Sequence, residues 1–218
     1  MAQESRIGKK SHPDDEESAR FELDSLRLLM DSLAEAENHE QIIEVSEKAE
    51  ELILSSVQDS FYLSFFRKYR GDAHYYLGDY AKSIDEYNDA IAATTETEEG
   101  LKQRATQLFD RANAEYQLKL MADCYQSTLA SEAILSKLEN PDYDYLISVY
   151  NDLAYQSREL AFYDDARKFL NKARAIYNSR KDIVDAFDIP VRKPVAFAYS
   201  EVLINAEAED EAEMLASM

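Results

Sequence analysis

The chain has 218 residues, of which 44 are acidic and 24 basic, so its formal net charge is −20 at pH 7. This charge argues against a nucleic-acid groove or an anionic membrane as a partner, because phosphate groups repel such a surface. One cysteine excludes a disulfide framework and a cysteine-based zinc site, and four glycines are too few for phosphate-binding loops or for an all-β fold.

The N-terminus is polar and lacks the apolar stretch of a secretory peptide. No window reaches the roughly 18 apolar residues that a membrane span needs. The single cysteine, Cys124, stands in an apolar context, which fits a reducing compartment. These features predict a soluble, cytoplasmic protein, with residues 1–15 as a disordered leader.

Apolar residues recur with helical spacing through most of the chain, and the linkers between them are short. The predicted helices cover residues 17–36, 40–57, 61–77, 80–95, 101–119, 121–138, 143–160, 163–179 and 191–204, with a short final one at 207–217. Because no linker is long enough to separate domains, residues 16–204 are expected to form one helical domain. Residues 205–218 hold five acids and no base, which suggests an acidic cap or a truncated helix.

One motif recurs along the chain. It has a small residue in a first helix, a turn, and then aromatic, small, large and small positions on a second helix. Its two clearest copies, 83 residues apart, are Gly71, Gly78, Tyr80, Ser83, Tyr87 and Ala90, and Ala154, Ala161, Tyr163, Ala166, Leu170 and Ala173. Weaker copies begin at Met30 and Ala112, so the period is 41–42 residues. A repeat of this length indicates helix pairs that stack to bury their apolar faces.

The motif resembles the tetratricopeptide repeat (TPR) family, in a long-helix variant. The resemblance implies an all-α fold: a right-handed α-solenoid of stacked antiparallel helix pairs, with about four repeats plus a C-terminal helix. It covers residues 22–178. Arg67 departs from the family, which has a large apolar residue there, and the proline that usually closes the second helix is missing.

No motif predicts catalysis. The three histidines, His12, His39 and His74, share no ligand spacing on one helix, and no phosphate loop or hydrolase motif occurs. Cys124 falls on a small, buried repeat position and is expected to be a core thiol. We therefore expect that the chain is not an enzyme and that it binds no metal or cofactor.

The resemblance also implies a concave groove lined by the first helices of the repeats. Positions three before, one after and four after the small residue are expected to project into it, and here they hold aromatic, amide and isolated charged side chains that suit a peptide. Phe65 is added as a residue at the groove edge. The candidates are therefore Phe65, Lys68, Asp72, Tyr75, Phe109, Asn113, Tyr116, Asn151, Tyr155 and Arg158. The alternative is that some of these aromatic residues only pack against neighbouring helices.

The leading hypothesis is a non-enzymatic scaffold or adaptor that binds a peptide or helix of a partner protein in this groove. The negative charge favours a basic or neutral partner. Asp72 and Asp110 stand where TPR modules that clamp a terminal carboxylate have asparagines, which argues against that subtype. Two alternatives stay open: a regulatory or sensor module of a larger signalling protein that binds a short peptide signal, and a homo-oligomer formed through solenoid ends, with residues 195–204 as the seam.

Overall fold

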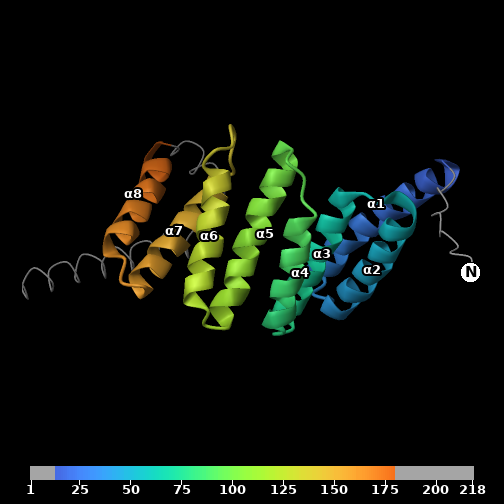
Figure 1. Ribbon diagram of the computed structural model, residues 1–218, viewed down its shortest axis with the longest axis horizontal. Coiled ribbons are helices and arrows are strands. Elements are labelled where there is room, and N and C mark those ends of the chain that lie inside the picture. The colour runs from blue at the N-terminus through green and yellow to red at the C-terminus, as the bar shows by residue number, and fades with distance from the viewer. Residues whose placement is uncertain (1–12, 180–218) are drawn as a thin grey trace, which may run out of the picture. The chain divides into compact units, whose positions relative to one another are not determined.

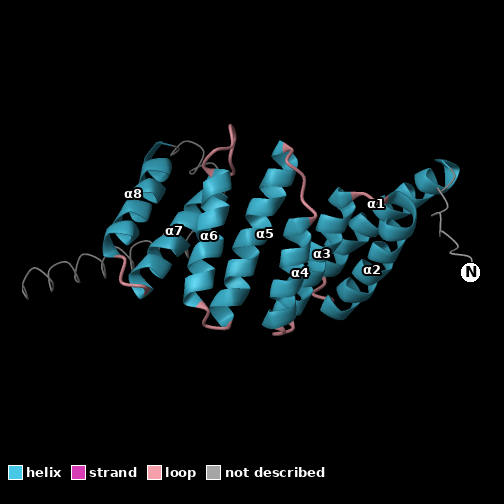
Figure 2. Cartoon of the chain, viewed as in Figure 1, coloured by secondary structure: helices cyan, strands magenta, loops and turns pink. Residues whose placement is uncertain are grey.

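The structure, a computed structural model, describes residues 13–179, and every regular element in that range is helical (Figure 2). The elements are α1 (Pro13–Glu35), α2 (His39–Leu52), η1 (Ile53–Val57), α3 (Ser60–Tyr76), α4 (Tyr80–Ala92), α5 (Glu98–Gln117), α6 (Met121–Leu135), α7 (Tyr143–Glu159) and α8 (Tyr163–Ser179). The helices predicted at 191–204 and 207–217, and the acidic cap at 205–218, lie outside the described residues.

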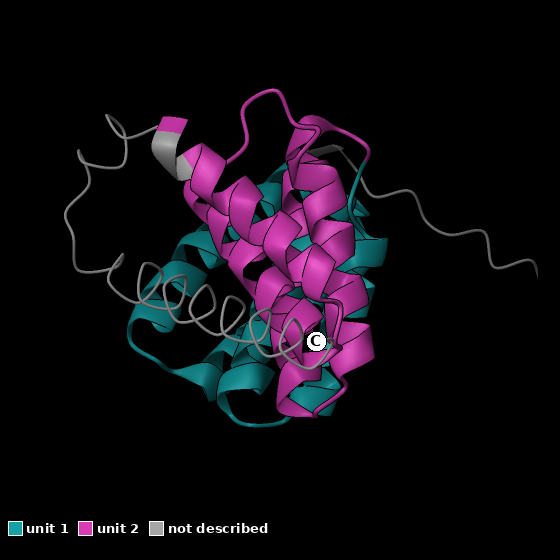
Figure 3. Ribbon diagram, turned by 90° about the vertical axis from the view of Figure 1, so that its left-hand side faces the viewer, with its two compact units in different colours: residues 1–95 teal, residues 96–218 magenta. Residues whose placement is uncertain are grey.

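Consecutive helices pack as antiparallel pairs: α1 with α2, α3 with α4, α5 with α6, and α7 with α8 (Figure 1). This confirms the all-helical repeat fold. The chain divides into two compact units, residues 1–95 and residues 96–218, which Figure 3 shows in different colours. The first unit holds α1 to α4 and the second holds α5 to α8. A single domain over residues 16–204 stays a prediction.

Side-chain caps fix where several helices begin. The carboxylates of Asp59 and Asp142 accept hydrogen bonds from the N–H groups of Phe61 and Tyr145, at 2.9 and 3.0 Å. The hydroxyl of Thr97 accepts a hydrogen bond from the N–H of Gly100 at 3.2 Å. With this cap α5 begins at Glu98, three residues earlier than predicted. Such caps satisfy N–H groups that have no partner inside the helix.

The turn inside each described helix pair uses the same backbone conformation. A residue with positive φ follows the first helix, and the next N–H reaches the carbonyl five residues earlier at 2.7–3.0 Å. These residues are Glu37 (54°), Gly78 (80°), Lys119 (61°) and Ala161 (59°). They recur at intervals of 41, 41 and 42 residues, which confirms the predicted period.

The end of α2 differs from the prediction. The apolar spacing predicted one α-helix over residues 40–57, but α2 ends at Leu52 and continues as the π-helical turn η1. Gln58, with φ of 50°, then closes the turn through a 2.7 Å hydrogen bond to the Ile53 carbonyl. A single π turn changes the hydrogen bonding while hardly changing the apolar pattern, so the sequence gives no signal for it.

The repeat positions on the second helices form the core of each unit. Each is at most 2% exposed: Ile42, Ser46 and Ala49; Ser83, Tyr87 and Ala90; Cys124, Thr128 and Ser131; Ala166, Leu170 and Ala173. Gly71 shows why the first helix needs a small residue, because a Cβ there would lie 2.8 Å from Cε1 of Tyr87. In the second unit the corresponding pair is Ala154 and Leu170, both buried.

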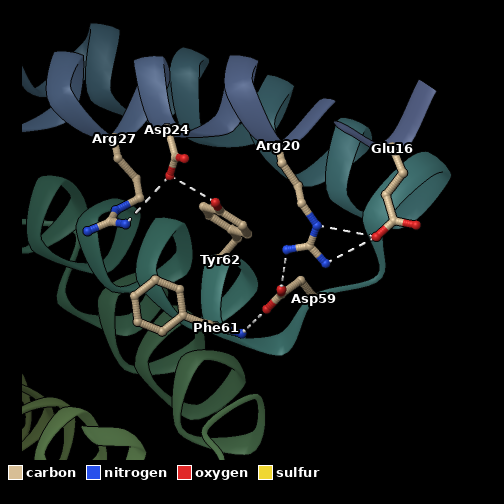
Figure 4. A network of polar contacts seen from close by, with 7 residues as sticks. All are labelled: Glu16, Arg20, Asp24, Arg27, Asp59, Phe61 and Tyr62. Carbon is tan, nitrogen blue, oxygen red and sulfur yellow. Dashed lines mark hydrogen bonds and ion pairs between the residues drawn. The ribbon is translucent and has the colours of Figure 1, made fainter. Parts of the chain in front are cut away.

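Polar contacts hold α1 on the start of α3 in the first unit (Figure 4). Arg20 donates to Asp59 at 2.8 Å, so the carboxylate that caps α3 also anchors α1. One turn further along α1, Asp24 accepts a 2.8 Å hydrogen bond from the Tyr62 hydroxyl. The guanidinium of Arg27 lies 5.2 Å from the centre of the Phe61 ring. These contacts fix the position of α1 along α3.

We expect Gly71→Ala to lower the free energy of unfolding by about 1–3 kcal/mol. The ring of Tyr87 is buried and is held by a 2.7 Å hydrogen bond to Asp72, so it cannot move aside without loss. Adding Tyr87→Leu reproduces the Ala154–Leu170 pair, and the double variant should lose about 1 kcal/mol less than the sum of the single changes. Urea denaturation of the four proteins measures this coupling, and strictly additive losses would contradict the close contact.

We expect Ala161→Gly to raise the free energy of unfolding by about 0.5–1 kcal/mol, because a side chain at positive φ is strained and glycine is not. The matched control is Ala154→Gly inside α7, which should lower it by about 1 kcal/mol or more. Thermal and urea unfolding of both variants would decide. Equal losses would mean that residue 161 is not left-handed in solution.

Candidate functional site

The predicted groove residues of the first unit lie on α3. Lys68 Nζ donates to Asp72 Oδ2 at 2.6 Å, one helical turn away. Asp72 Oδ1 also accepts the hydroxyl of Tyr87 at 2.7 Å, so this carboxylate links the two helices of the pair. The charges of Lys68 and Asp72 therefore offset one another on α3.

The two predicted aromatic residues of α3 have ring neighbours within the first unit. The Phe65 ring centre lies 4.8 Å from that of Tyr69, and 5.0 Å from the guanidinium of Arg27. The Tyr75 ring centre lies 5.5 Å from that of Tyr80 on α4. Both side chains are only half-buried, so they combine packing with an accessible surface.

In the second unit, Tyr116 of α5 and Tyr155 of α7 lie side by side. Their hydroxyl oxygens are 3.1 Å apart, and the ring centres are 6.1 Å apart in an edge-to-face arrangement. The guanidinium of Arg158 lies 5.1 Å from the centre of the Tyr155 ring and donates to Glu159 at 2.6 Å. The hydrogen bond with Tyr116, together with burial, raises the pKa of Tyr155, so the Tyr155 hydroxyl is neutral at pH 7.

The structure buries two of the predicted groove residues. Phe109 is 9% exposed and packs edge-to-face on Tyr145, with ring centres 5.3 Å apart. Asn151 is 8% exposed, and neither side-chain polar atom has a hydrogen-bond partner in the described range. Both stand three residues before the small one, so in α5 and α7 this position belongs to the helix packing. In α3 the same position, Lys68, is half-buried.

Asp152 on α7 is a site residue that the sequence did not single out. It stands seven residues after Tyr145 and three before Tyr155, so the three share one face of the helix. Tyr145 donates to the Thr106 carbonyl at 3.4 Å, and Tyr155 contacts Tyr116, so this face is turned toward α5. Half-buried Asn113 lies on α5, one turn before Tyr116. The surface formed by Asn113, Tyr116, Asp152, Tyr155 and Arg158 is called the α5–α7 surface below.

The carboxylate of Asp152 makes no hydrogen bond or ion pair with the described residues. Burial raises its pKa from 3.8 to about 6, with no neighbouring cation to lower it again. Repeat register could have pointed to this residue, because Asp152 precedes Ala154 by two positions as Asp110 precedes Ala112. That position was outside the predicted groove set.

Three other half-buried or buried carboxylates in the described part have a cationic neighbour. Burial alone raises the pKa of Glu50, but hydrogen bonds from Arg67 and Arg70 outweigh burial and lower it. Glu115 accepts from the Ser127 hydroxyl at 2.6 Å and lies 3.3 Å from Arg111. Glu132 accepts from Lys172 at 2.9 Å and from Tyr150 at 3.1 Å. Compared with these three, Asp152 lacks a cation.

Among residues 13–179, no group of three or more His, Cys, Asp or Glu side chains is arranged to hold a metal ion. Cys124 is 1% exposed, and burial raises its pKa to about 12, so it is a thiol and not a reactive thiolate at pH 7. Within the same range, none of the helices combines the length and the apolar character that crossing a membrane requires.

No protein-family model and no curated protein matches this chain. Solved structures that are similar to it include the following. A Podosopora anserina protein described as a kinesin light chain with nearly identical TPR-like repeats is 13% identical, with a TM-score of 0.65 over 91% of this chain and 92% of its own. BtubC (BKLC) from P. vanneervenii is 16% identical, with a TM-score of 0.69 over 92% of this chain and 86% of its own.

The apo form of RapI is also 16% identical, with a TM-score of 0.68 over 87% of this chain and 50% of its own, so the chain spans half of that protein. At these identities the likeness concerns the fold. It agrees with the antiparallel pairs, the recurring left-handed turn and the buried small positions described above. Together they show that the chain has a TPR-like helical repeat fold.

Proposed function

We propose that the chain is a non-enzymatic interaction module that binds a peptide or helix of a basic or neutral partner on the α5–α7 surface. Stacked helical repeats generally serve protein interaction, because their first helices present one continuous binding surface. The residues on this surface provide two aromatic hydroxyls, an amide and charges of both signs. None of these groups needs a cofactor to bind a peptide.

The observation that carries the proposal is the uncompensated carboxylate of Asp152. A half-buried carboxylate without a cation destabilises a fold, and the chain supplies such cations elsewhere, as at Glu50 and Glu132. A lysine or arginine side chain of a partner would provide the missing charge. The neighbouring rings of Tyr145 and Tyr155 would favour the same cation through their π faces.

Other groups of the α5–α7 surface suit the rest of a peptide. Half-buried Asn113 makes no hydrogen bond with the described residues, so its amide is available both to donate to and to accept from a peptide backbone. Tyr116 is 41% exposed and offers flat apolar area with a polar hydroxyl. The net charge of −20 adds a long-range attraction for basic partners.

Selection from a random peptide library with the full chain should enrich peptides that contain lysine or arginine. Asp152→Asn should then weaken binding of a selected peptide about 10- to 100-fold, because a charge-assisted hydrogen bond is lost from a half-buried site. The matched control, Asp144→Asn, removes the same charge from an exposed position on α7 and should change affinity less than threefold. Fluorescence anisotropy of labelled peptides measures both.

Two results of that selection would contradict the proposal. One is a consensus without basic residues, and the other is an affinity that Asp152→Asn and Asp144→Asn reduce equally. A selected peptide that binds through Asp152 and also changes the hydrodynamic radius of the chain would favour the regulatory module over the scaffold. The scaffold is expected to keep its radius.

The pKa of Asp152 also predicts a pH-dependent stability. Because its folded pKa of about 6 lies above the ordinary value of 3.8, the folded state binds the proton more tightly than the unfolded state. This tighter proton binding stabilises the folded state below pH 4, and the stabilisation is lost as the pH rises through 6. We therefore expect Asp152→Asn to raise the free energy of unfolding by about 1–3 kcal/mol at pH 8, and by much less at pH 4. Urea denaturation at the two pH values tests this, and a loss of stability at pH 8 would mean that Asp152 has a structural partner.

A further inference from the structure

The last described helix, α8, carries a basic face in an acidic protein. After Asp165, the helix has four bases and no acid as far as Ser179, in a chain whose net charge is −20. The bases are Arg167, Lys168, Lys172 and Arg174. The side chains of Arg167 and Lys168 are 53% and 62% exposed, so their charges face solvent.

An open, shallow pocket runs along this helix. It is lined by Asp164, Arg167, Lys168, Asn171, Lys172 and Ala175. Lys172 is held in place, because it donates to Glu132 at 2.9 Å and lies 5.0 Å from the centre of the Tyr150 ring. Its position gives the pocket a fixed cationic side.

Lys168 and Arg174 of this face are weakly compensated within the described part. Arg167 lies 3.8 Å from the fully exposed Asp164, and Lys168 lies 3.9 Å from Asp165. Contacts of this length between exposed groups are worth little. Arg174 is exposed and makes no ion pair with the described residues. The face therefore attracts an anionic segment.

The chain itself contains such a segment, within reach of α8. Residues 205–218 hold five acids and no base. The 25 residues between 180 and 204 extend to at most roughly 80 Å, whereas α8 is only about 26 Å long. Because both segments belong to one chain, a contact between them is intramolecular, which favours even a weak interaction.

We propose that the basic face of α8, formed by Arg167, Lys168, Lys172 and Arg174, is the docking site for the chain's own acidic segment, residues 205–218. The charges of the two segments are complementary, with four bases on α8 and five acids in residues 205–218. Because the contact relies on exposed charges, salt weakens it. A basic protein that takes residues 205–218, or an acidic one that takes α8, displaces it. This inference does not depend on the function proposed for Asp152.

Disulfide cross-linking in the full chain tests the proposal. Lys168→Cys combined with Glu211→Cys should form an intramolecular disulfide under mild oxidation at low micromolar protein. The native Cys124 does not interfere, because it is buried and remains a thiol at neutral pH. The matched control pairs Glu211→Cys with Lys82→Cys, an exposed lysine of α4. We expect the first pair to react at least tenfold faster than the control at low salt, with most of the difference lost in 0.5 M NaCl.

Non-reducing electrophoresis and mass spectrometry separate the outcomes. Equal rates for the two pairs would overturn the proposal. So would a disulfide-linked dimer as the main product of the first pair, because the segment would then dock on a second copy. Retention of the full rate difference in high salt would show that charge does not hold the contact, and would also contradict the proposal.

A charge-reversed variant tests the role of the cations separately. In a second reporter, Asn171→Cys with Glu211→Cys, adding Arg167→Glu and Arg174→Glu should slow cross-linking at least fivefold. Adding Arg167→Lys and Arg174→Lys instead keeps the charges and should leave the rate within twofold. Circular dichroism checks that all variants are equally helical. A folded charge-reversed variant that cross-links as fast as its parent would overturn the proposal.

Discussion

The close approach of a small residue on one helix to a large one on the next packs α3 against α4 and α7 against α8. Gly71 lies so near the ring of Tyr87 that even a methyl group would clash, and Ala154 with Leu170 repeats the arrangement with smaller groups. Because an isolated pair cannot bury both apolar faces, neighbouring pairs must stack. The same left-handed turn recurs in every described pair, because each second helix must run antiparallel beside the first helix of its pair.

Several half-buried carboxylates in the described part of this protein are paired within the packing. Glu50 lies between two arginines, Asp72 bonds both Lys68 and Tyr87, and Asp59 both caps α3 and anchors α1. Against this pattern, Asp152 stands out because the fold provides a desolvated carboxylate without a cation. Such a group lowers stability, and the binding proposed for Asp152 would offset that loss, which is the usual relation between binding sites and stability.

The sequence predicted the existence and order of the described helices, and most helix starts to within one residue. Caps and turns account for this accuracy, because Asp142 and Gly78 specify local geometry through their own chemistry. The candidate site was predicted less well. Tyr116 is exposed and Tyr155 and Arg158 are half-buried, whereas Phe109 and Asn151 are buried. The position three before the small residue lies near the edge of the helix interface, so neighbouring side chains decide whether it is covered.

The sequence by itself determined the repeat period, the small and large positions that pack, and the net charge. These features depend on residues close together in the chain and on composition. Only the tertiary structure decided that Tyr116 meets Tyr155, that η1 interrupts the end of α2, and that Asp152 has no cation while Glu50 has two. Each of these depends on which side chains from separate helices come within a few ångströms of one another, and helical periodicity within one segment contains no information about that distance.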